Sequence, residues 1–225
     1  VKWFILGLSF GLLILSTSKT SLFVFVILLA LLPLYKSLQW HFNIRVFMYC
    51  LSIFAVIVTV TWVLGNPKFI FNAMGRDPTL TGRTDLWETV INMIRKRPFL
   101  GYGYNAVWVD EVSAYVSQLL GWERIVHAHN GFLDICLELG LLGLIVFTAG
   151  FFQAVRNAIK MIFLTNSMEA LWPLVYLTFL LIYNLAESSL IQHNRLTWVL
   201  YVSVILSLYS SINKNTMLDS HYKDA

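Results

Sequence analysis

Charged residues are scarce in this sequence. Asp, Glu, Lys and Arg make up 12% of the 225 residues, whereas 58% are hydrophobic and 15% are aromatic. Soluble domains carry about 25% charged residues, so this composition excludes an ordinary soluble domain and indicates an integral membrane protein. In lipid, the backbone polar groups of a segment must be satisfied internally, as they are in a helix. We therefore expect an all-α fold, a polytopic transmembrane helical bundle.

Cysteine is almost absent, and long runs of like charge are missing. The two cysteines, Cys50 and Cys136, lie in separate apolar stretches, which argues against a disulfide framework and a cysteine-based metal site. The net charge is +4, and the sequence contains no basic run typical of a nucleic-acid-binding surface. We expect no nucleic acid partner.

The apolar residues form six runs, which we interpret as transmembrane spans. They cover residues 3–16, 21–35, 44–64, 131–154, 171–186 and 196–212, and the first, second and fifth are short for a complete crossing. The first run could mimic a signal peptide, but a second run follows within five residues, so we favour a membrane hairpin. Because the chain starts at Val1, inside an apolar run and without an initiator Met, we interpret it as the C-terminal part of a longer protein.

These spans predict the domain organisation and the orientation. Residues 1–64 and 131–212 would each hold three spans, 65–130 would form a long external segment, and 213–225 a cytoplasmic tail. Basic residues in short loops resist translocation. One side has Lys2, Lys36, Arg45, Arg156, Lys160, Lys214 and Lys223, and the other has Lys19 and Arg195. The first side is therefore predicted to be cytoplasmic, and the external segment is periplasmic if the membrane is a bacterial inner membrane.

The external segment contains a helical pattern, "TDLWETVINMIRKRP". Its apolar residues recur on one stripe: Leu86, Trp87, Val90, Ile91 and Ile94. We expect Asp85 to cap this short amphipathic helix and Pro98 to end it. Its apolar face would rest on the membrane surface or on the bundle.

Polar residues from four stretches are predicted to meet on the external face. They are Lys19, Arg83, His127, His129, Glu187, His193 and Arg195. His127 and His129 resemble half of a metal site, but two ligands do not make a site, and we expect no metal. Arg83 has an alternative in an ion pair with Asp85 or Asp77.

Two acids and two glycines follow the histidines. Asp134 and Glu138 share one helical face just inside the fourth span, where acids usually face the bundle interior or a watery cavity. They would orient His129 or line a path for an acceptor, or else have a purely structural role. Gly140 and Gly143 are expected to allow close helix packing.

Four motifs resemble a known family. "STSKTS", "GRDPTLTGRTDLW", "RPFLGYGYN" and "HAHNGFLDICLELGLLG" occur in that order. Together they resemble the C-terminal region of the O-antigen ligase and polymerase family of bacterial surface polysaccharide synthesis. The most specific piece is His129-Asn130, followed after nine residues by Gly140 and Gly143. The second motif resembles most the exopolysaccharide polymerase branch.

The resemblance implies a metal-independent glycosyltransferase with a GT-C-like helical fold and no cofactor. Its donor would be a saccharide linked to a polyprenyl diphosphate, such as undecaprenyl diphosphate. His129 would take the acceptor proton, and Arg83 would hold the diphosphate through two parallel donors. Lys19 lies where the family commonly has Arg, so the positive charge is kept but the two parallel N–H donors of a guanidinium are lost.

Further residues and partners complete this prediction. Asn130, Glu138 and Glu187 are candidates for substrate binding, with Glu187 placed to assist the acceptor. Partners would be the lipid-linked oligosaccharide, membrane lipids, and a chain-length regulator and flippase of the same pathway. The alternatives to a polymerase are an O-antigen ligase, which transfers glycan to a lipid A core, and a transporter or flippase. A transporter is expected to show charged or broken helices near the bilayer midplane, and the third, fifth and sixth spans carry no such residues.

Overall fold

The computed structural model describes residues 2–65, 83–108, 113, 116–118, 121, 125–192 and 195–223. These residues form helices and no strand, which confirms the predicted all-α class. The main elements are α1 (Lys2–Leu15), α2 (Lys19–Ser37), α3 (Phe42–Gly65), α5 (Arg83–Lys96), α7 (Gly131–Thr165), the 3-10 helix η2 (Met168–Leu171), α8 (Trp172–Tyr183) and α9 (Leu196–Lys223).

Each of the six predicted apolar runs forms a helix. Among the described residues, Lys19–Ser37, Gly131–Thr165 and Leu196–Asn213 are long and apolar enough to cross a membrane, and Trp3–Leu15, Phe42–Val58 and Met168–Tyr183 are shorter apolar helices. Helix α9 continues to Lys223, so the predicted tail begins as an extension of the last helix and not as a separate segment.

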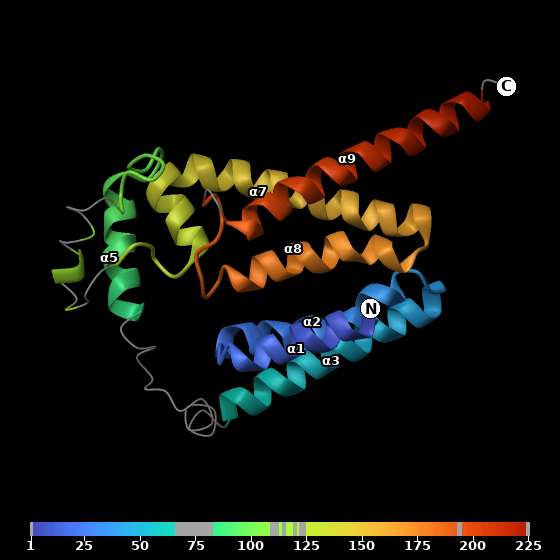
Figure 1. Cartoon of the computed structure of the whole chain (residues 1–225), viewed down its shortest axis with the longest axis horizontal. Coiled ribbons are helices and arrows are strands. Elements are labelled where there is room, and N and C mark those ends of the chain that lie inside the picture. Colours follow the sequence, from blue (N-terminus) through green and yellow to red (C-terminus); the bar gives the residue numbers. More distant parts are fainter. Residues whose placement is uncertain are drawn as a thin grey trace.

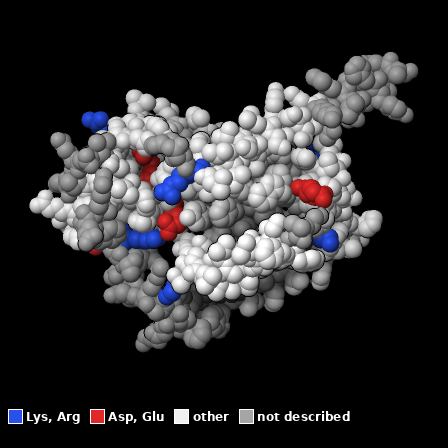
Figure 2. All heavy atoms as spheres, in the orientation of Figure 1, with Lys and Arg blue, Asp and Glu red and all other residues white. Residues whose placement is uncertain are grey.

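The outer surface of the helices is apolar. Trp3 of α1 is 85% exposed, Phe54 of α3 is 65% exposed and Val146 of α7 is 73% exposed. Figure 2 shows charged side chains near the two ends of the molecule with an uncharged band between them. Such a band is what a bilayer core requires of a helical bundle, and the protein is therefore a membrane protein.

The helices place distant segments at two opposite ends (Figure 1). The α1–α2 turn, α5, the start of α7 and the α8–α9 connection lie at one end, which we call the α5 end. The α2–α3 and α7–α8 connections lie at the other. There, Gln39 Nε2 donates to the carbonyl oxygen of Ser167 at 2.8 Å, and the guanidinium of Arg45 lies 5.4 Å from the ring centre of Phe163.

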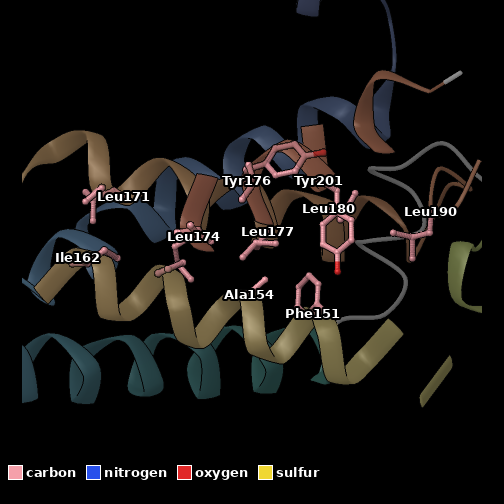
Figure 3. Packing of buried hydrophobic residues seen from close by; sticks show 14 of the residues in the cluster. Phe151, Ala154, Ile162, Leu171, Leu174, Tyr176, Leu177, Leu180, Leu190 and Tyr201 are labelled. Carbon is pink, nitrogen blue, oxygen red and sulfur yellow. The ribbon is translucent and has the colours of Figure 1, made fainter. Parts of the chain in front are cut away.

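The largest core lies between α7, α8 and α9. Leu177 and Leu180 of α8 and Ala158 of α7 are completely buried. Figure 3 shows Phe151 of α7 facing the α8 and α9 side chains, close to Tyr201. Burial of such side chains contributes roughly 1.5–3 kcal/mol each relative to a water-exposed state, and it fixes the α8–α9 connection relative to the start of α7.

A second core joins α5 to the start of α7. Leu86 and Val90 of α5 are fully buried against Leu137 of α7, so the apolar stripe rests on the bundle, although Ile91 is 39% exposed. The helix begins at Arg83 and not after Asp85. The prediction that Asp85 caps the helix is therefore wrong: the carboxylate lies in the first turn, where the helix dipole still favours it.

Helix α7 is broken at Gly140, which has φ +67° and ψ −169°. The loop after α5 enters this break. The N–H groups of Tyr102 and Gly103 donate to the carbonyl oxygens of Leu137 (2.9 Å) and Glu138 (2.8 Å), and the N–H of Leu141 donates to the oxygen of Pro98 at 2.8 Å. Backbone groups that the break leaves without helical partners are thus satisfied by a distant segment.

Gly140 therefore has a different role from the predicted one. A Cβ at this position would lie 2.2 Å from the carbonyl oxygen of Phe99, and a Cβ at Gly101 would lie 2.6 Å from the backbone of Glu138. Both glycines have positive φ. They allow the loop and the broken helix to approach each other, and they do not serve to pack two helices together.

We expect Gly140→Ala to destabilise the protein by about 1–3 kcal/mol or more, because φ +67° with ψ −169° lies in a backbone region that is essentially restricted to glycine, and the Cβ would also collide with Phe99. Gly11→Ala in α1 is the matched control, since nothing lies within 4 Å of its added Cβ. Thermal unfolding of the full-length protein in detergent measures both. Equal stability of the two variants would contradict the role assigned to Gly140.

Candidate active site

Arg83 begins α5 and points toward the α8–α9 connection. Its Nη1 donates to the carbonyl oxygen of Ala186 at 2.7 Å, and its Nη2 lies 3.5 Å from Oε1 of Glu187. Of the partners weighed for Arg83 from the sequence, Asp85 makes no such pair, and Asp77 lies outside the described residues. The ion pair joins segments more than a hundred residues apart in the chain.

His129 lies in the turn before α7. Its φ is +52°, a left-handed conformation that L-residues seldom adopt. The turn is held by Trp87 of α5, whose Nε1 donates to the carbonyl oxygen of Ala128 at 2.9 Å. The N–H of His129 donates to Nδ1 of His127 at 3.3 Å, and the two rings meet edge to face with centres 4.2 Å apart.

The α8–α9 connection brings Glu187 to the same place. The N–H of Gly131 donates to the carbonyl oxygens of Asn184 (2.9 Å) and Glu187 (3.1 Å). The side chain of Glu187 reaches His129, with Oε2 3.7 Å from Nδ1. Arg83, Glu187 and His129 therefore form a row in which the carboxylate lies between the guanidinium and the imidazole. We call these three residues the Arg–Glu–His row.

The surroundings of His129 favour a neutral imidazole. Partial burial lowers its pKa below the ordinary value of 6.5, and the neighbouring His127 and Arg83 lower it further, whereas Glu187 opposes them. Burial likewise lowers the pKa of His127. Nδ1 of His129 is buried and has no partner within hydrogen-bond distance. A neutral imidazole keeps a lone pair on one of its two nitrogens, so His129 is able to accept a proton at neutral pH.

Asn130 caps helix α7. Its Oδ1 accepts from the N–H groups of Phe132 (3.0 Å) and Leu133 (3.1 Å), and its Nδ2 donates to the carbonyl oxygen of Leu185 at 3.3 Å. An N-cap contributes about 1 kcal/mol. These contacts make Asn130 a residue that holds the His129 turn against the α8–α9 connection. Substrate contact by Asn130 stays a prediction.

Glu138 lies apart from the Arg–Glu–His row. Its Oε2 accepts from the N–H of Asn105 at 3.1 Å, and it is buried. Asp134 is also buried and accepts through Oδ1 from Nε1 of Trp108 (3.1 Å) and from the N–H of Ala128 (3.0 Å). Both acids precede the break in α7 and bond to residues of the segment between α5 and α7, in line with the structural alternative given for them from the sequence.

Two of the remaining candidates, Lys19 and Arg195, lie at the α5 end (Figure 1). Lys19 is exposed at the start of α2, and the α1–α2 turn lies at this end (Figure 1). Arg195 is exposed, and its Nε donates to Oε1 of Gln192 at 3.0 Å. His193 lies outside the described residues. Within the described part, no group of three His, Cys, Asp or Glu side chains is placed to hold a metal ion.

Sequence reasoning missed two of the residues that position the site. Trp87 of α5 holds the carbonyl oxygen of Ala128, and the fully buried Asn184 organises the α8–α9 connection by accepting from the N–H groups of Ser189 (2.8 Å) and Leu190 (3.1 Å). The N–H of Ala128 is held by Asp134, for which orientation of His129 was one of the roles expected from the sequence. A signal for Asn184 exists in the sequence, because it is a lone amide directly after an apolar run.

Comparison with known proteins identifies relatives over parts of the chain. The exopolysaccharide production protein ExoQ of Rhizobium meliloti is 36% identical over 102 residues, which are 43% of this chain and 23% of ExoQ. A putative polysaccharide ligase of Rickettsia prowazekii is 30% identical over 112 residues, 43% of this chain and 28% of the relative. The ComP-specific O-oligosaccharyltransferase of Acinetobacter baylyi is 27% identical over 135 residues, 58% and 24% of the two chains.

The aligned segments thus span about a quarter of the length of these relatives. No solved structure matches the chain. The family model described as O-antigen ligase matches residues 4–148, more than half of the chain, and this match includes Arg83, His129 and the break at Gly140. The chain belongs to the O-antigen ligase family.

Proposed function

We propose that this chain carries the catalytic end of a membrane glycosyltransferase that polymerises a bacterial surface polysaccharide or exopolysaccharide. The donor is a saccharide linked to a polyprenyl diphosphate, and the acceptor is a hydroxyl group of another saccharide. The observation that carries this proposal is the Arg–Glu–His row, in which a guanidinium and a neutral imidazole from distant segments share one carboxylate.

The reaction needs a proton acceptor and an anion-binding group. The acceptor oxygen attacks the anomeric carbon of the donor and forms a new C–O bond, and its proton passes to the imidazole of His129. The bond between the anomeric carbon and the diphosphate oxygen breaks, and the polyprenyl diphosphate leaves with the electron pair. Arg83 stabilises the charge that grows on the diphosphate, with Lys19 as a second cation from the same end of the bundle. The histidine then returns its proton to solvent or to the leaving group.

The names of the relatives support transfer of saccharides. ExoQ is described by exopolysaccharide production, the Rickettsia protein as a polysaccharide ligase and the Acinetobacter protein as an O-oligosaccharyltransferase. We favour the polymerase because "DPTLTGRTDLW" resembles the exopolysaccharide branch and ExoQ is 36% identical to the aligned part. Ligation to a lipid A core is the second candidate and uses the same donor chemistry.

The proposal includes a location and partners. The α5 end would face the periplasm across the bacterial inner membrane, since Lys36 and Arg45 lie at the opposite end and basic loops stay in the cytoplasm. The substrate would be a polyprenyl-diphosphate-linked oligosaccharide delivered by a flippase, with a chain-length regulator as a further partner.

A reconstituted reaction tests the proposal. The full-length protein in liposomes would be incubated with a lipid-diphosphate-linked oligosaccharide, with and without a lipid A core acceptor and with a chelator present throughout. A polymerase gives chains of several repeats on the lipid diphosphate, and a ligase gives glycan on the lipid A core. Movement of unaltered donor across the bilayer, with neither product, would overturn the proposal in favour of a transporter.

The pH dependence of this reaction follows from His129. The base must be neutral to act, and its pKa is lowered below 6.5 by burial, His127 and Arg83. Activity should therefore be full at neutral pH and fall only as the pH drops through a value below 6.5, about tenfold for each further unit. A profile of kcat/KM between about pH 5 and pH 8 measures this fall in activity at acidic pH. A midpoint above 6.5 would contradict His129 as the base.

A further inference from the structure

Glu187 holds an intermediate position in the Arg–Glu–His row. Its Oε1 lies 3.5 Å from Nη2 of Arg83, and its Oε2 lies 3.7 Å from Nδ1 of His129. Both distances exceed those of good charge-assisted hydrogen bonds, which are about 2.7–2.9 Å. The carboxylate is thus shared between two partners and is fully bonded to neither through these atoms.

The two partners of Glu187 have different alternatives. Arg83 is the group that the proposed donor diphosphate would engage, and its side chain is 21% exposed. His129 has no alternative at Nδ1, because this nitrogen is buried and lacks a hydrogen-bond partner. If a ligand binds Arg83 in place of Glu187, the imidazole of His129 is the neighbour with which the carboxylate is then able to form a hydrogen bond.

We propose that Glu187 is a positioning residue that couples binding of the donor diphosphate to the position of the proton on the His129 imidazole. This inference rests on the proposed function. When no diphosphate is bound, Glu187 is the anion that pairs with Arg83. When a diphosphate replaces it, the carboxylate closes on Nδ1 of His129 and accepts its proton in a hydrogen bond. The proton then resides on Nδ1, and the lone pair of Nε2 is directed to the acceptor hydroxyl.

The surrounding contacts make this movement a matter of side chains alone. The backbone of Glu187 is fixed to α7 through the N–H of Gly131, and Asn130 donates from its N–H to Oγ of Ser188 at 3.0 Å. His129 is held by its bond to His127. The backbone on both sides is thus held in place. A carboxylate released from Arg83 needs to shorten the 3.7 Å distance between its Oε2 and Nδ1 of His129 by less than about 1 Å to form a normal hydrogen bond.

Three titratable or charged groups from three segments act on the imidazole of His129. The groups that act electrostatically on His129 are His127 from its own turn, Arg83 from α5 and Glu187 from the α8–α9 connection. Glu187 is the one carboxylate among them. The coupling is therefore assigned to Glu187 and not to Asp134, whose Oδ1 is engaged by Trp108 and Ala128.

Inorganic diphosphate is the probe for the first experiment. The full-length protein, labelled with ¹⁵N-histidine in detergent at about pH 7.5, would be titrated with it, and the His129 signals would be assigned by their loss in His129→Asn. Diphosphate should shift the tautomer population of His129 toward the Nδ1-protonated form in the wild type but not in Glu187→Gln. Arg83→Gln frees Glu187 without a ligand, so it should show the Nδ1-protonated state without diphosphate.

Binding and turnover should change in opposite directions in Glu187→Gln. Diphosphate should bind more tightly, by at least threefold, because the variant removes the anion that competes for Arg83. The kcat of glycosyl transfer should fall by at least tenfold, because the imidazole loses the carboxylate that orients it. Glu187→Asp should recover part of kcat. Glu88→Gln, which removes an exposed carboxylate from α5, should change neither quantity.

The outcomes separate the two proposals. If diphosphate binds in an Arg83-dependent way and the proton of His129 stays on the same nitrogen, the coupling is overturned and the proposed function stands. Weaker diphosphate binding in Glu187→Gln also overturns the coupling, because it indicates a merely structural role. If diphosphate does not bind to the wild type, the proposed function fails and the coupling fails with it.

Discussion

Replacement of His129 should lower the rate of glycosyl transfer by about 10²–10⁴-fold, the range that a general base contributes. His129→Asn is the better variant, because His129 has φ +52° and Asn tolerates the left-handed conformation more readily than Ala does. Asn cannot accept a proton at neutral pH. A loss of activity in this variant is therefore a loss of chemistry and not of the turn.

The measurement is the initial rate of chain extension in liposomes at matched protein levels. His41→Asn is the matched control, since His41 is an exposed histidine before α3 at the opposite end of the molecule. It should retain the wild-type rate. Binding of inorganic diphosphate should persist in His129→Asn, because Arg83 is intact. A rate within threefold of the wild type would remove His129 from the reaction.

A further difference between the two variants tests the strain at this position. His129→Ala removes the same imidazole but places Ala in a left-handed conformation, which costs about 1 kcal/mol more than it costs Asn or Gly. His129→Ala should therefore lose both rate and stability, and His129→Asn should lose rate at near-native stability. Thermal unfolding of the two proteins in detergent separates the catalytic effect from the conformational one.

Local pattern predicted most of the fold. Apolar composition alone located the six helices, and the 3.6-residue stripe around Leu86 and Val90 located α5, because both signals are contained in short stretches of sequence. The alternation of spans also predicted that Arg83, His129 and Glu187 share one end of the bundle. These three do meet in the structure.

The sequence alone did not predict which residue pairs with Arg83. Arg83 has Asp85 as a near neighbour in the chain, yet it pairs with Glu187, because the core between α7 and α8 places the α8–α9 connection against the start of α5. Such a choice depends on tertiary packing over more than a hundred residues. No local pattern carries it.

The break in α7 was hidden for a similar reason. Gly140 lies in a stretch that reads as a continuous apolar span, and a glycine alone is tolerated in a helix at a cost of about 1 kcal/mol. The break is stable because the loop from Pro98 to Gly103 supplies its hydrogen bonds. Asp134 and Glu138 consequently lie in the first part of α7, before the break, where they bond to the segment that precedes the helix.

Replacement of Arg83 by Gln should lower kcat for glycosyl transfer by about 10²–10³-fold, the range observed when one preorganised donor to a developing negative charge is lost. The guanidinium offers two parallel donors to phosphate oxygens, so Arg83→Lys should recover part of the rate through its charge alone. The donor KM should rise in Arg83→Gln as well, since the diphosphate is present in the ground state.

The matched control for Arg83 lies on the same helix. Arg95 is exposed in the last turn of α5, where its Nη1 contacts Oδ1 of Asn92 at 3.2 Å, and Arg95→Gln makes the same chemical change at a distance from the row. It should retain wild-type activity and diphosphate binding. An Arg83 variant that bound inorganic diphosphate as the wild type does would show that another cation holds the leaving group, with Lys19 the first to test. Because Arg83 also donates to Ala186, unfolding temperatures of both variants are needed to show that the α8–α9 connection stays in place.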